Sequence, residues 1–167
     1  MKRTIIRSLI ILSIIVINVG CDQVSKSIVR HNIHFKQSIR VVDSFVTLTN
    51  VENKGAFLSL GDSLGTPLRI LLLLLMPIFG LGYGLLLVFR KKDIRLPMLI
   101  GICFVIGGGI GNLFDRLVHG SVTDFLHINF VIFQTGIFNM ADVSIMVGLF
   151  LILIESTIYY RGQGISG

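Results

Sequence analysis

Four long apolar runs, each flanked by charged residues, constrain the fold of this chain more strongly than any other feature. A helix that crosses a lipid bilayer needs about 20 consecutive, mostly apolar residues. The second run lies between Arg69 and Arg90 and the third begins at Leu96, and neither contains a charged side chain. We therefore predict an all-α membrane protein, with residues 1–167 forming a single integral membrane domain. The predicted crossings are at about residues 4–29, 68–89, 96–114 and 140–160.

The composition excludes two broad alternatives. Hydrophobic residues make up 53% of the chain and charged residues 14%, whereas soluble domains carry about 25% charged residues. A disordered chain needs low hydrophobicity and high charge, and a soluble monomer needs more polar side chains to cover its surface. The net charge of +6 would favour nucleic-acid binding in a soluble protein. Here the basic residues flank apolar runs, so we expect them to set membrane topology, and we expect no nucleic-acid partner.

The distribution of basic residues predicts the orientation of the helices. Three basic residues precede the first run, and residues 90–95 contain four. Short loops rich in Lys and Arg stay in the cytoplasm. Both termini are therefore predicted to be cytoplasmic, and residues 30–67 and 115–139 are predicted to lie outside. The first run alone also resembles a secretory signal peptide, but the three crossings that follow favour a retained helix.

Parts of the two outer segments are typical of β-strands. Val41, Val42 and residues 45–49 are rich in β-branched and aromatic side chains. Residues 122–128 alternate between two sets of side chains, as the two faces of a strand do. We expect a small extracytoplasmic β-sheet and loop lying on the outer membrane face, not a second domain.

Polar and ionisable residues gather where three of the helices reach the predicted outer face. Such residues are costly at membrane depth and commonly mark function. The middles of the four runs contain no charged residue. The gathered side chains are Asp22 and Lys26 in the first helix, Asn112, Asp115 and Arg116 at the end of the third, Asp124 beyond it, and Asn139 and Asp142 at the start of the fourth.

For most of these residues a structural role competes with a role in a site. Asp22 and Lys26 have the i, i+4 spacing of a helical ion pair, which would fix the first helix as readily as it would bind a ligand. Arg116 could pair with a carboxylate, hold a phosphate or anchor its helix at the interface. Asp115 faces a neighbouring direction and could be solvated. Asn139 could cap the fourth helix, because Asn is a preferred N-cap residue, and capping can coexist with a role in a site.

Asp124 and Asp142 suggest a particular chemistry. Asp142 lies in the first turn of the fourth helix, where the helix dipole favours a carboxylate, and Asp124 lies in an apolar stretch with no basic residue beside it. If the two carboxyl groups meet, they share a proton, and such a pair can hydrolyse a peptide bond by general acid and base catalysis. Nucleophilic catalysis has little support, because no Ser or Cys is paired with a His at this depth. Cys21 and Cys103 lie at different depths, so we predict no disulfide. The two cysteines and four histidines show no metal-ligand spacing, so we predict no metal site.

Four sequence blocks together carry a resemblance to a known family. They are DQVSK at residues 22–26, NKGAF at 53–57, GGGIGNLFDR at 107–116 continuing to GSVTDF at 120–125, and FNMAD at 138–142. Any one block is weakly specific, whereas four in this order and at these topological positions are very specific. The sequence resembles the lipoprotein signal peptidase family, also called signal peptidase II, which consists of intramembrane aspartic proteases.

The resemblance implies a membrane-embedded aspartic endopeptidase with four transmembrane helices and a small outer sheet. It would remove the signal peptide of a diacylglyceryl-modified prolipoprotein by cleaving before the lipidated cysteine. Asp124 and Asp142 match the family's catalytic pair, and Gly55 matches a turn in its outer loop. Positions that bind substrate or support the site match Asp22, Lys26, Asn53, Asn112, Arg116 and Asn139, to which we add Asp115.

The resemblance also implies a setting for the reaction. The location would be the bacterial cytoplasmic (inner) membrane, with the active site near the outer face, and no metal or organic cofactor would be needed. The expected partners are the lipid-modified precursor and membrane lipids. One chain supplies every residue of the constellation, so we expect a monomer.

Other classes make different predictions. A transporter or channel would place polar residues along a path through the bilayer, and a structural membrane subunit would leave its acids solvated in loops. A GxGD-type intramembrane aspartic protease would carry that motif at one of its aspartates, and the motif is absent around Asp124 and Asp142.

Overall fold

The computed structural model describes residues 2–42, 45–55, 65–130 and 132–164, and for residues 2, 3 and 160–164 the backbone alone. Ala56 and Phe57 of the second sequence block lie outside these ranges. The described chain contains four helices that are long and apolar enough to cross a membrane, which confirms the predicted fold class. The candidate spans are Thr4–Asn32, Thr66–Arg90, Leu96–His119 and Met140–Tyr159.

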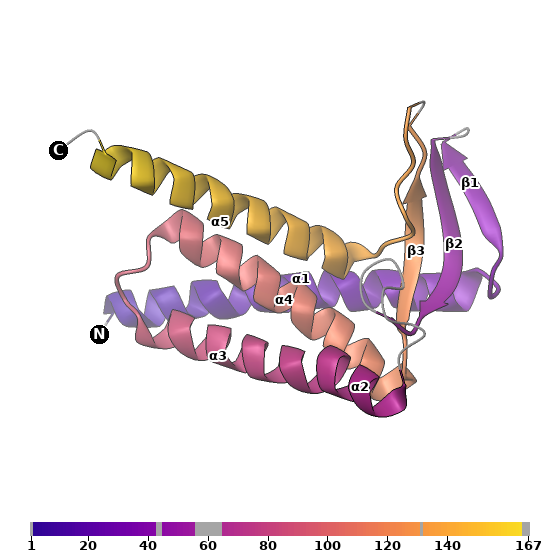
Figure 1. Ribbon diagram of the computed structural model, residues 1–167, viewed down its shortest axis with the longest axis horizontal. Helices are drawn as coiled ribbons and strands as arrows, with labels where there is room; N and C mark the ends of the chain where they lie inside the picture. Colours follow the sequence, from indigo (N-terminus) through magenta and orange to yellow (C-terminus); the bar gives the residue numbers. More distant parts are fainter. Residues whose placement is uncertain (1, 43–44, 56–64, 131, 165–167) are drawn as a thin grey trace.

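The helices form one bundle, and a three-stranded sheet stands across one end of it (Figure 1). The N-terminus, the C-terminus and the connection between α3 and α4 lie at the opposite end. In chain order the elements are α1 (Lys2–Asn32), β1 (Ser38–Val42), β2 (Val46–Asn53), α2 (Thr66–Ile70), η2 (Leu71–Leu75), α3 (Met76–Arg90), α4 (Leu96–His119), β3 (Val122–Ile128) and α5 (Met140–Gly164).

The second candidate span changes from α-helical to π-helical geometry at residues 71–75. The α-helical turn α2 continues through the π-helical segment η2 into α3. Pro77 follows this segment as the second residue of α3. In a regular helix the proline ring would clash with the carbonyl group four residues earlier. The wider π-helical turn before Pro77 relieves that clash.

Close contacts of α4 with two other helices depend on its glycines. A Cβ atom added at Gly107 would lie 2.7 Å from Cβ of Asn18 in α1. A Cβ atom at Gly108 would overlap the carbonyl oxygen of Ala141 in α5. Small residues let helices in a membrane approach closely, so this stretch of α4 packs between α1 and α5.

The helix α4 continues beyond the predicted crossing. It ends at His119, where Gly120 adopts a left-handed conformation with φ of 75° and caps the helix. Asp115 and Arg116, which the sequence placed at the end of this helix, lie within it, and the segment between α4 and α5 begins with the turn at Gly120.

The predicted strands are present, and the sheet joins two segments that are far apart in the sequence. Its order is β1-β2-β3 with antiparallel pairing throughout. The register pairs Val51 with Asp124 and Asn53 with Val122. This places the end of β2, with its asparagine, beside the strand that carries Asp124. Phe125 on β3 also packs against α1, which ties the sheet to the bundle.

Candidate active site

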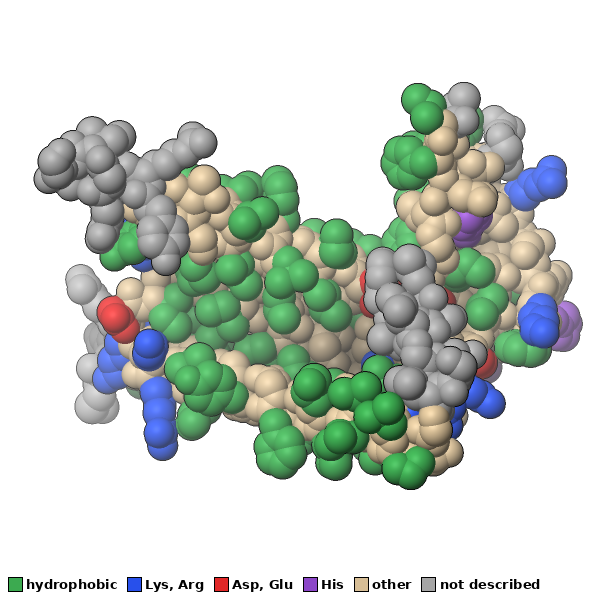
Figure 2. Space-filling model, in the orientation of Figure 1, with side chains coloured by type: hydrophobic (Ala, Val, Ile, Leu, Met, Phe, Trp, Pro, Cys, Tyr) green, Lys and Arg blue, Asp and Glu red, His purple; other side chains and the backbone are tan. Residues whose placement is uncertain are grey.

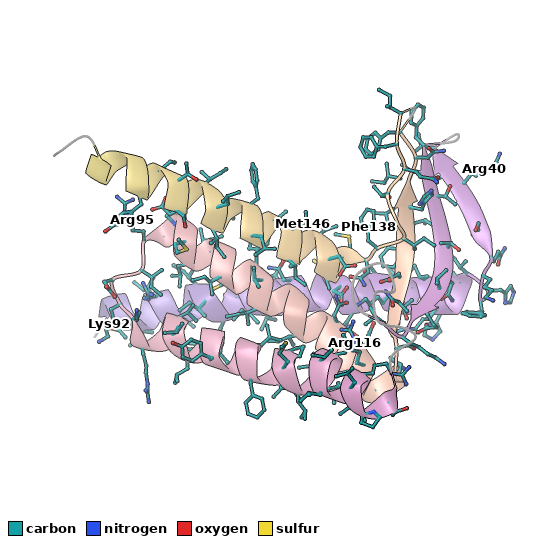
Figure 3. The ribbon with its side chains drawn as sticks, in the orientation of Figure 1. Arg40, Lys92, Arg95, Arg116, Phe138 and Met146 are labelled. Carbon is teal, nitrogen blue, oxygen red and sulfur yellow. The ribbon has the colours of Figure 1, made fainter. Side chains whose placement is uncertain are left out.

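The polar residues that the sequence placed at the ends of three helices lie close together where the helix bundle meets the sheet. Figure 3 labels Arg116, Phe138 and Met146 around this junction. A buried polar group is costly unless it is hydrogen-bonded, so the partners of these residues define the site. The buried members are Asp22, Lys26, Asn53, Asn112, Asp115, Asp124 and Asn139.

The start of α5 is fixed by a reciprocal cap between Asn139 and Asp142. The backbone N–H of Asp142 donates to Oδ1 of Asn139 at 3.0 Å. In return, the backbone N–H of Asn139 donates to Oδ2 of Asp142 at 3.2 Å. This is the arrangement of a capping box, with Asp at the position usually held by Glu or Gln. The N-cap role expected for Asn139 is confirmed, and the cap also sets the direction of the Asp142 carboxyl group.

Asp124 is held by two side-chain amides from different elements. Nδ2 of Asn139 donates to its Oδ1 atom at 2.6 Å, and Nδ2 of Asn53 donates to its Oδ2 atom at 2.9 Å. The cap explains the direction of the first amide, because Oδ1 of Asn139 already accepts from Asp142. Asn139 thus contacts both carboxyl groups, which lie close together as the sequence hypothesis requires.

Asn112 connects Asp142 to a buried cation. Its Oδ1 atom accepts from Nζ of Lys26 at 3.0 Å and from Nδ2 of Asn139 at 3.2 Å. Two donors on one oxygen fix the orientation of the amide, so the Nδ2 atom of Asn112 points to Oδ1 of Asp142, at 2.9 Å. Each oxygen of the two carboxyl groups therefore has a donor within the described structure.

Behind Asn112 lies a buried cluster of charges. Nζ of Lys26 lies 2.7 Å from Oδ2 of Asp22 and 3.0 Å from Oδ2 of Asp115, and all three side chains are fully buried. Asp22 also accepts from the backbone N–H of Ala141, next to the cap of α5. The ion pair allowed by the i, i+4 spacing is therefore present. The expectation that Asp115 could be solvated is wrong, because a second cation, Arg30, reaches it from α1 at 2.9 Å.

Arg116 and Gly55 contact each other at the edge of the site. Nη2 of Arg116 donates to the carbonyl oxygen of Gly55 at 2.8 Å, and Nη1 donates to that of Asn112 at 3.4 Å. The backbone N–H of Gly55 donates to Oδ1 of Asn53. The hydrogen bonds of Arg116 in the described structure thus go to carbonyl oxygens, which ties the chain after β2 to α4.

Burial changes the acidity of Asp124, which lies on β3. Loss of hydration raises the pKa of its carboxyl group to about 6. The amides of Asn53 and Asn139 lower this pKa, because they donate to the ionised form, while the charge of Asp142 raises it. Together these effects keep Asp124 protonated to a higher pH than an exposed aspartate.

Two apolar grooves meet at Asp142, which is half-buried. One, of about 430 Å³, lies between the second span and α5, and Asn112, Arg116 and Pro77 are among its lining residues. The other, of about 510 Å³, lies between α5 and the segment after β3, and is lined by Phe133, Gln134, Thr135, Gly136, Phe138, Asp142, Val143, Met146 and Val147. An extended apolar molecule could reach Asp142 along either groove. Within the described residues, no three His, Cys, Asp or Glu side chains converge as a metal site would require.

The sequence did not predict a second set of residues, which positions Asp124 through hydrogen bonds to the adjacent residue, Thr123. Oγ1 of Thr123 accepts from Nε of Arg30 at 2.7 Å and donates to Oε1 of Glu52 at 2.9 Å. The backbone N–H of Thr123 donates to Oδ2 of Asp115 at 3.3 Å. One signal was present in the sequence, since Arg30 continues the four-residue spacing of Asp22 and Lys26 along α1. The role of Glu52 depends on strand register and had no such signal.

The fold and the site together define a class, that of four-helix membrane proteins with two closely spaced carboxyl groups where the helices meet a sheet. Comparison with protein families identifies the family of this class to which the chain belongs. Residues 14–158 match the family model described as signal peptidase (SPase) II. The chain belongs to the signal peptidase II family, and its function is the cleavage of lipoprotein signal peptides.

Curated relatives agree over most of the chain. The lipoprotein signal peptidase of Pseudoalteromonas atlantica is 36% identical over 135 residues, covering 80% of each protein. That of Wigglesworthia glossinidia brevipalpis is 31% identical over 154 residues, covering 91% of this chain and 94% of the relative. That of Bacillus subtilis is 32% identical over 139 residues, covering 82% and 86%.

Solved structures agree with the fold. One bacterial membrane enzyme, determined by the in meso method at 2.3 Å resolution, superposes with a TM-score of 0.78 at 28% identity, covering 88% of this chain and 87% of the other. A second, at 1.9 Å resolution, gives a TM-score of 0.76 at 29% identity, covering 87% and 90%. The chain is therefore a bacterial membrane peptidase.

Proposed function

We propose that the chain cleaves lipoprotein signal peptides as an aspartic endopeptidase, with Asp124 and Asp142 as its catalytic pair. The observation that carries this proposal is the position of Asn139. Its side chain donates to Asp124, while its backbone and side chain form the reciprocal cap with Asp142. One residue thereby fixes two carboxyl groups relative to each other beside two apolar grooves.

The surroundings of the two carboxyl groups favour different roles. Asp124 is buried, and its raised pKa gives it a larger protonated fraction near neutral pH than an exposed aspartate has, which suits a general acid. Asp142 is half-buried and lines both grooves, so its carboxylate meets water and substrate, which suits a general base.

The reaction follows from these roles. The Asp142 carboxylate takes a proton from water as the water oxygen bonds to the carbonyl carbon of the peptide. Asp124 gives its proton to the carbonyl oxygen, which yields a neutral tetrahedral intermediate. Asp142 then gives its proton to the amide nitrogen, the carbon–nitrogen bond breaks, and Asp124 recovers a proton from one hydroxyl group as the new carboxylic acid forms.

The remaining site residues support this pair. Asn112 and Asn53 hold one carboxyl group each, and the Lys26 cluster with Asp22 and Asp115 orients Asn112. These residues, together with Arg116 and Gly55, come from α1, α4, β2 and the segment directly after β2. All of them belong to one chain, so a monomer suffices for the reaction. Arg116 also lines the groove shared with Asp142.

The substrate we propose is a precursor that carries a diacylglyceryl group on the cysteine after the cleaved bond. A lipid anchor confines the precursor to the bilayer, so it reaches the grooves by lateral diffusion. The basic residues 90–95 lie at the end of the bundle opposite the sheet. By the positive-inside rule that end, with both termini, faces the cytoplasm, and the site lies near the outer face of the inner membrane.

The test is cleavage of a lipid-modified precursor by the purified protein in lipid bilayers. Asp124→Asn and Asp142→Asn each keep the size of the side chain and remove its acid function, so each is expected to abolish cleavage. Asp93→Asn is the matched control, because Asp93 is an exposed acid in the connection between α3 and α4. It is expected to retain full activity.

Folding of each variant is checked by thermal unfolding and gel filtration. Cleavage retained by a folded Asp124→Asn or Asp142→Asn protein would refute the proposed pair. Loss of cleavage in Asp93→Asn as well would show that the assay reports something other than the pair. A precursor without its lipid is expected to be cleaved much more slowly.

A further inference from the structure

The chain forms an exposed aromatic hairpin directly after β3. The backbone N–H of Thr135 donates to the carbonyl oxygen of Ile128, and that of Phe130 donates to the carbonyl oxygen of Phe133. The rings of Phe130 and Phe133 stack with their centroids 4.5 Å apart. Ile132 is 94% exposed and Phe133 61% exposed. We call residues 128–130 and 132–135 the aromatic hairpin, and residue 131 lies outside the described ranges.

The aromatic hairpin overhangs α5. In Figure 1 the sheet crosses the end of the bundle, and the connection from β3 to α5 extends beyond α5 at the top of the view. Phe133 lines the 510 Å³ groove together with Met146 and Val147 of α5. The hairpin therefore lies beside the first turns of α5, and the groove separates the two.

The length of α5 gives the depth of this contact. Its candidate span, Met140–Tyr159, has 20 residues, which is about 30 Å of helix and equals the thickness of the hydrocarbon core of a bilayer. Val147 is seven residues into that span, about 10 Å from its start. Phe133 lines the same groove as Val147, so the hairpin adjoins a groove that extends along α5 to the level of the acyl chains.

The two sides of the sheet differ in polarity near the hairpin. Figure 2 shows hydrophobic side chains on the side of this region that faces the helices and basic side chains on the opposite side. Arg40 of β1 points away from the bundle (Figure 3). The apolar side of the hairpin continues the exposed apolar surface of α5, to which Met146 and Phe150 belong.

We propose that the aromatic hairpin inserts into the acyl-chain region of the leaflet beside α5 and anchors the sheet there. The occupant of its apolar surface is lipid, because that surface lies on the side of the sheet that faces the helices and continues the exposed apolar surface of α5. The anchor holds β3, and with it Asp124, at a constant height relative to the bilayer. This proposal concerns membrane contact and is independent of the catalytic roles given above.

The chain contains no tryptophan, so a single tryptophan reports on one position. Phe133→Trp and Ile132→Trp place the probe on the hairpin. Phe35→Trp is the matched control, because Phe35 is 59% exposed and lies in the connection from α1 to β1, beyond the sheet (Figure 1). The α1 span has 29 residues, about 44 Å of helix, so its end extends past the hydrocarbon core.

Each variant is placed in nanodiscs that hold one copy of the chain and no precursor. Lipids brominated near the headgroup end of their acyl chains are expected to quench most of the emission of Phe133→Trp and Ile132→Trp. Aqueous iodide is expected to quench Phe35→Trp instead. Thermal unfolding and gel filtration check that the variants are folded, and the quenching itself does not depend on cleavage.

Two results would overturn the proposal. Quenching of the hairpin probes by iodide and not by brominated lipid would place the hairpin in water. Insensitivity to both quenchers would mean that protein covers the hairpin. A failure of the catalytic proposal would appear in the cleavage assay and would leave the quenching pattern unchanged.

Discussion

Replacing Asn53 tests whether the protonated form of Asp124 is the active form. The substitution Asn53→Leu removes the amide that donates to Oδ2 of Asp124 at 2.9 Å and keeps a side chain of similar size. The lost hydrogen bond stabilises the ionised carboxylate. Its removal therefore raises the pKa of Asp124.

The size of the change follows from the burial of both partners. Asn53 is 5% exposed and Asp124 is 4% exposed, so water replaces little of the lost bond. Hydrogen bonds to charged groups contribute about 1.5–3 kcal/mol, and 1.36 kcal/mol corresponds to about one pH unit. Starting from a pKa of about 6, the alkaline limb of kcat/KM moves up by about one to two pH units.

The assay is precursor cleavage measured across the pH range, with Asn50→Leu as the control. Asn50 lies on the same strand and is also buried, but it donates to the carbonyl oxygen of Ile33. The control is expected to lose stability and keep its pH profile. An alkaline limb of Asn53→Leu that stays in place or moves down would refute the reasoning, as would an equal upward shift in Asn50→Leu.

Two further predictions concern the buried parts of the bundle. Lys26→Met leaves Asp22 and Asp115 buried without their shared cation, so we expect the free energy of unfolding to fall by about 3–5 kcal/mol. The measurement is unfolding in detergent. A variant as stable as the parent would contradict the role of the cluster. Gly108→Leu forces α4 away from Ala141, so we expect a lower melting temperature and a loss of cleavage. Gly82→Leu serves as the unaffected control, because a Cβ atom added at Gly82 meets no other atom within 4 Å.

The sequence predicted the fold well because its strongest signals are local. Runs of apolar residues specify membrane helices by length and hydropathy, and short β-branched segments specify strands. The sequence placed Asp115 and Arg116 at the outer end of the third helix but did not predict how far this helix continues. Their charges are met by partners within the protein, and the helix runs to His119, where Gly120 caps it.

Most residues of the candidate site were predictable from the sequence, but the contacts between them were not. Spacing along one helix gave the pair of Asp22 and Lys26, and capping preference gave Asn139. The part played by Arg30 and Glu52 around Thr123 arises only when α1, β2 and β3 meet. Such contacts depend on strand register and helix packing, which one sequence does not reveal.

The reciprocal cap at the start of α5 makes the assembly of the enzyme an ordered event. Residues 139–142 follow the other three spans in the chain, so a growing polypeptide has neither Asp142 nor its cap until the fourth span enters the bilayer. With Asp142 in the proposed catalytic pair, folding of that helix and the gain of proteolytic capacity are expected to coincide. A chain that lacks the fourth span is then expected to be inert toward signal peptides.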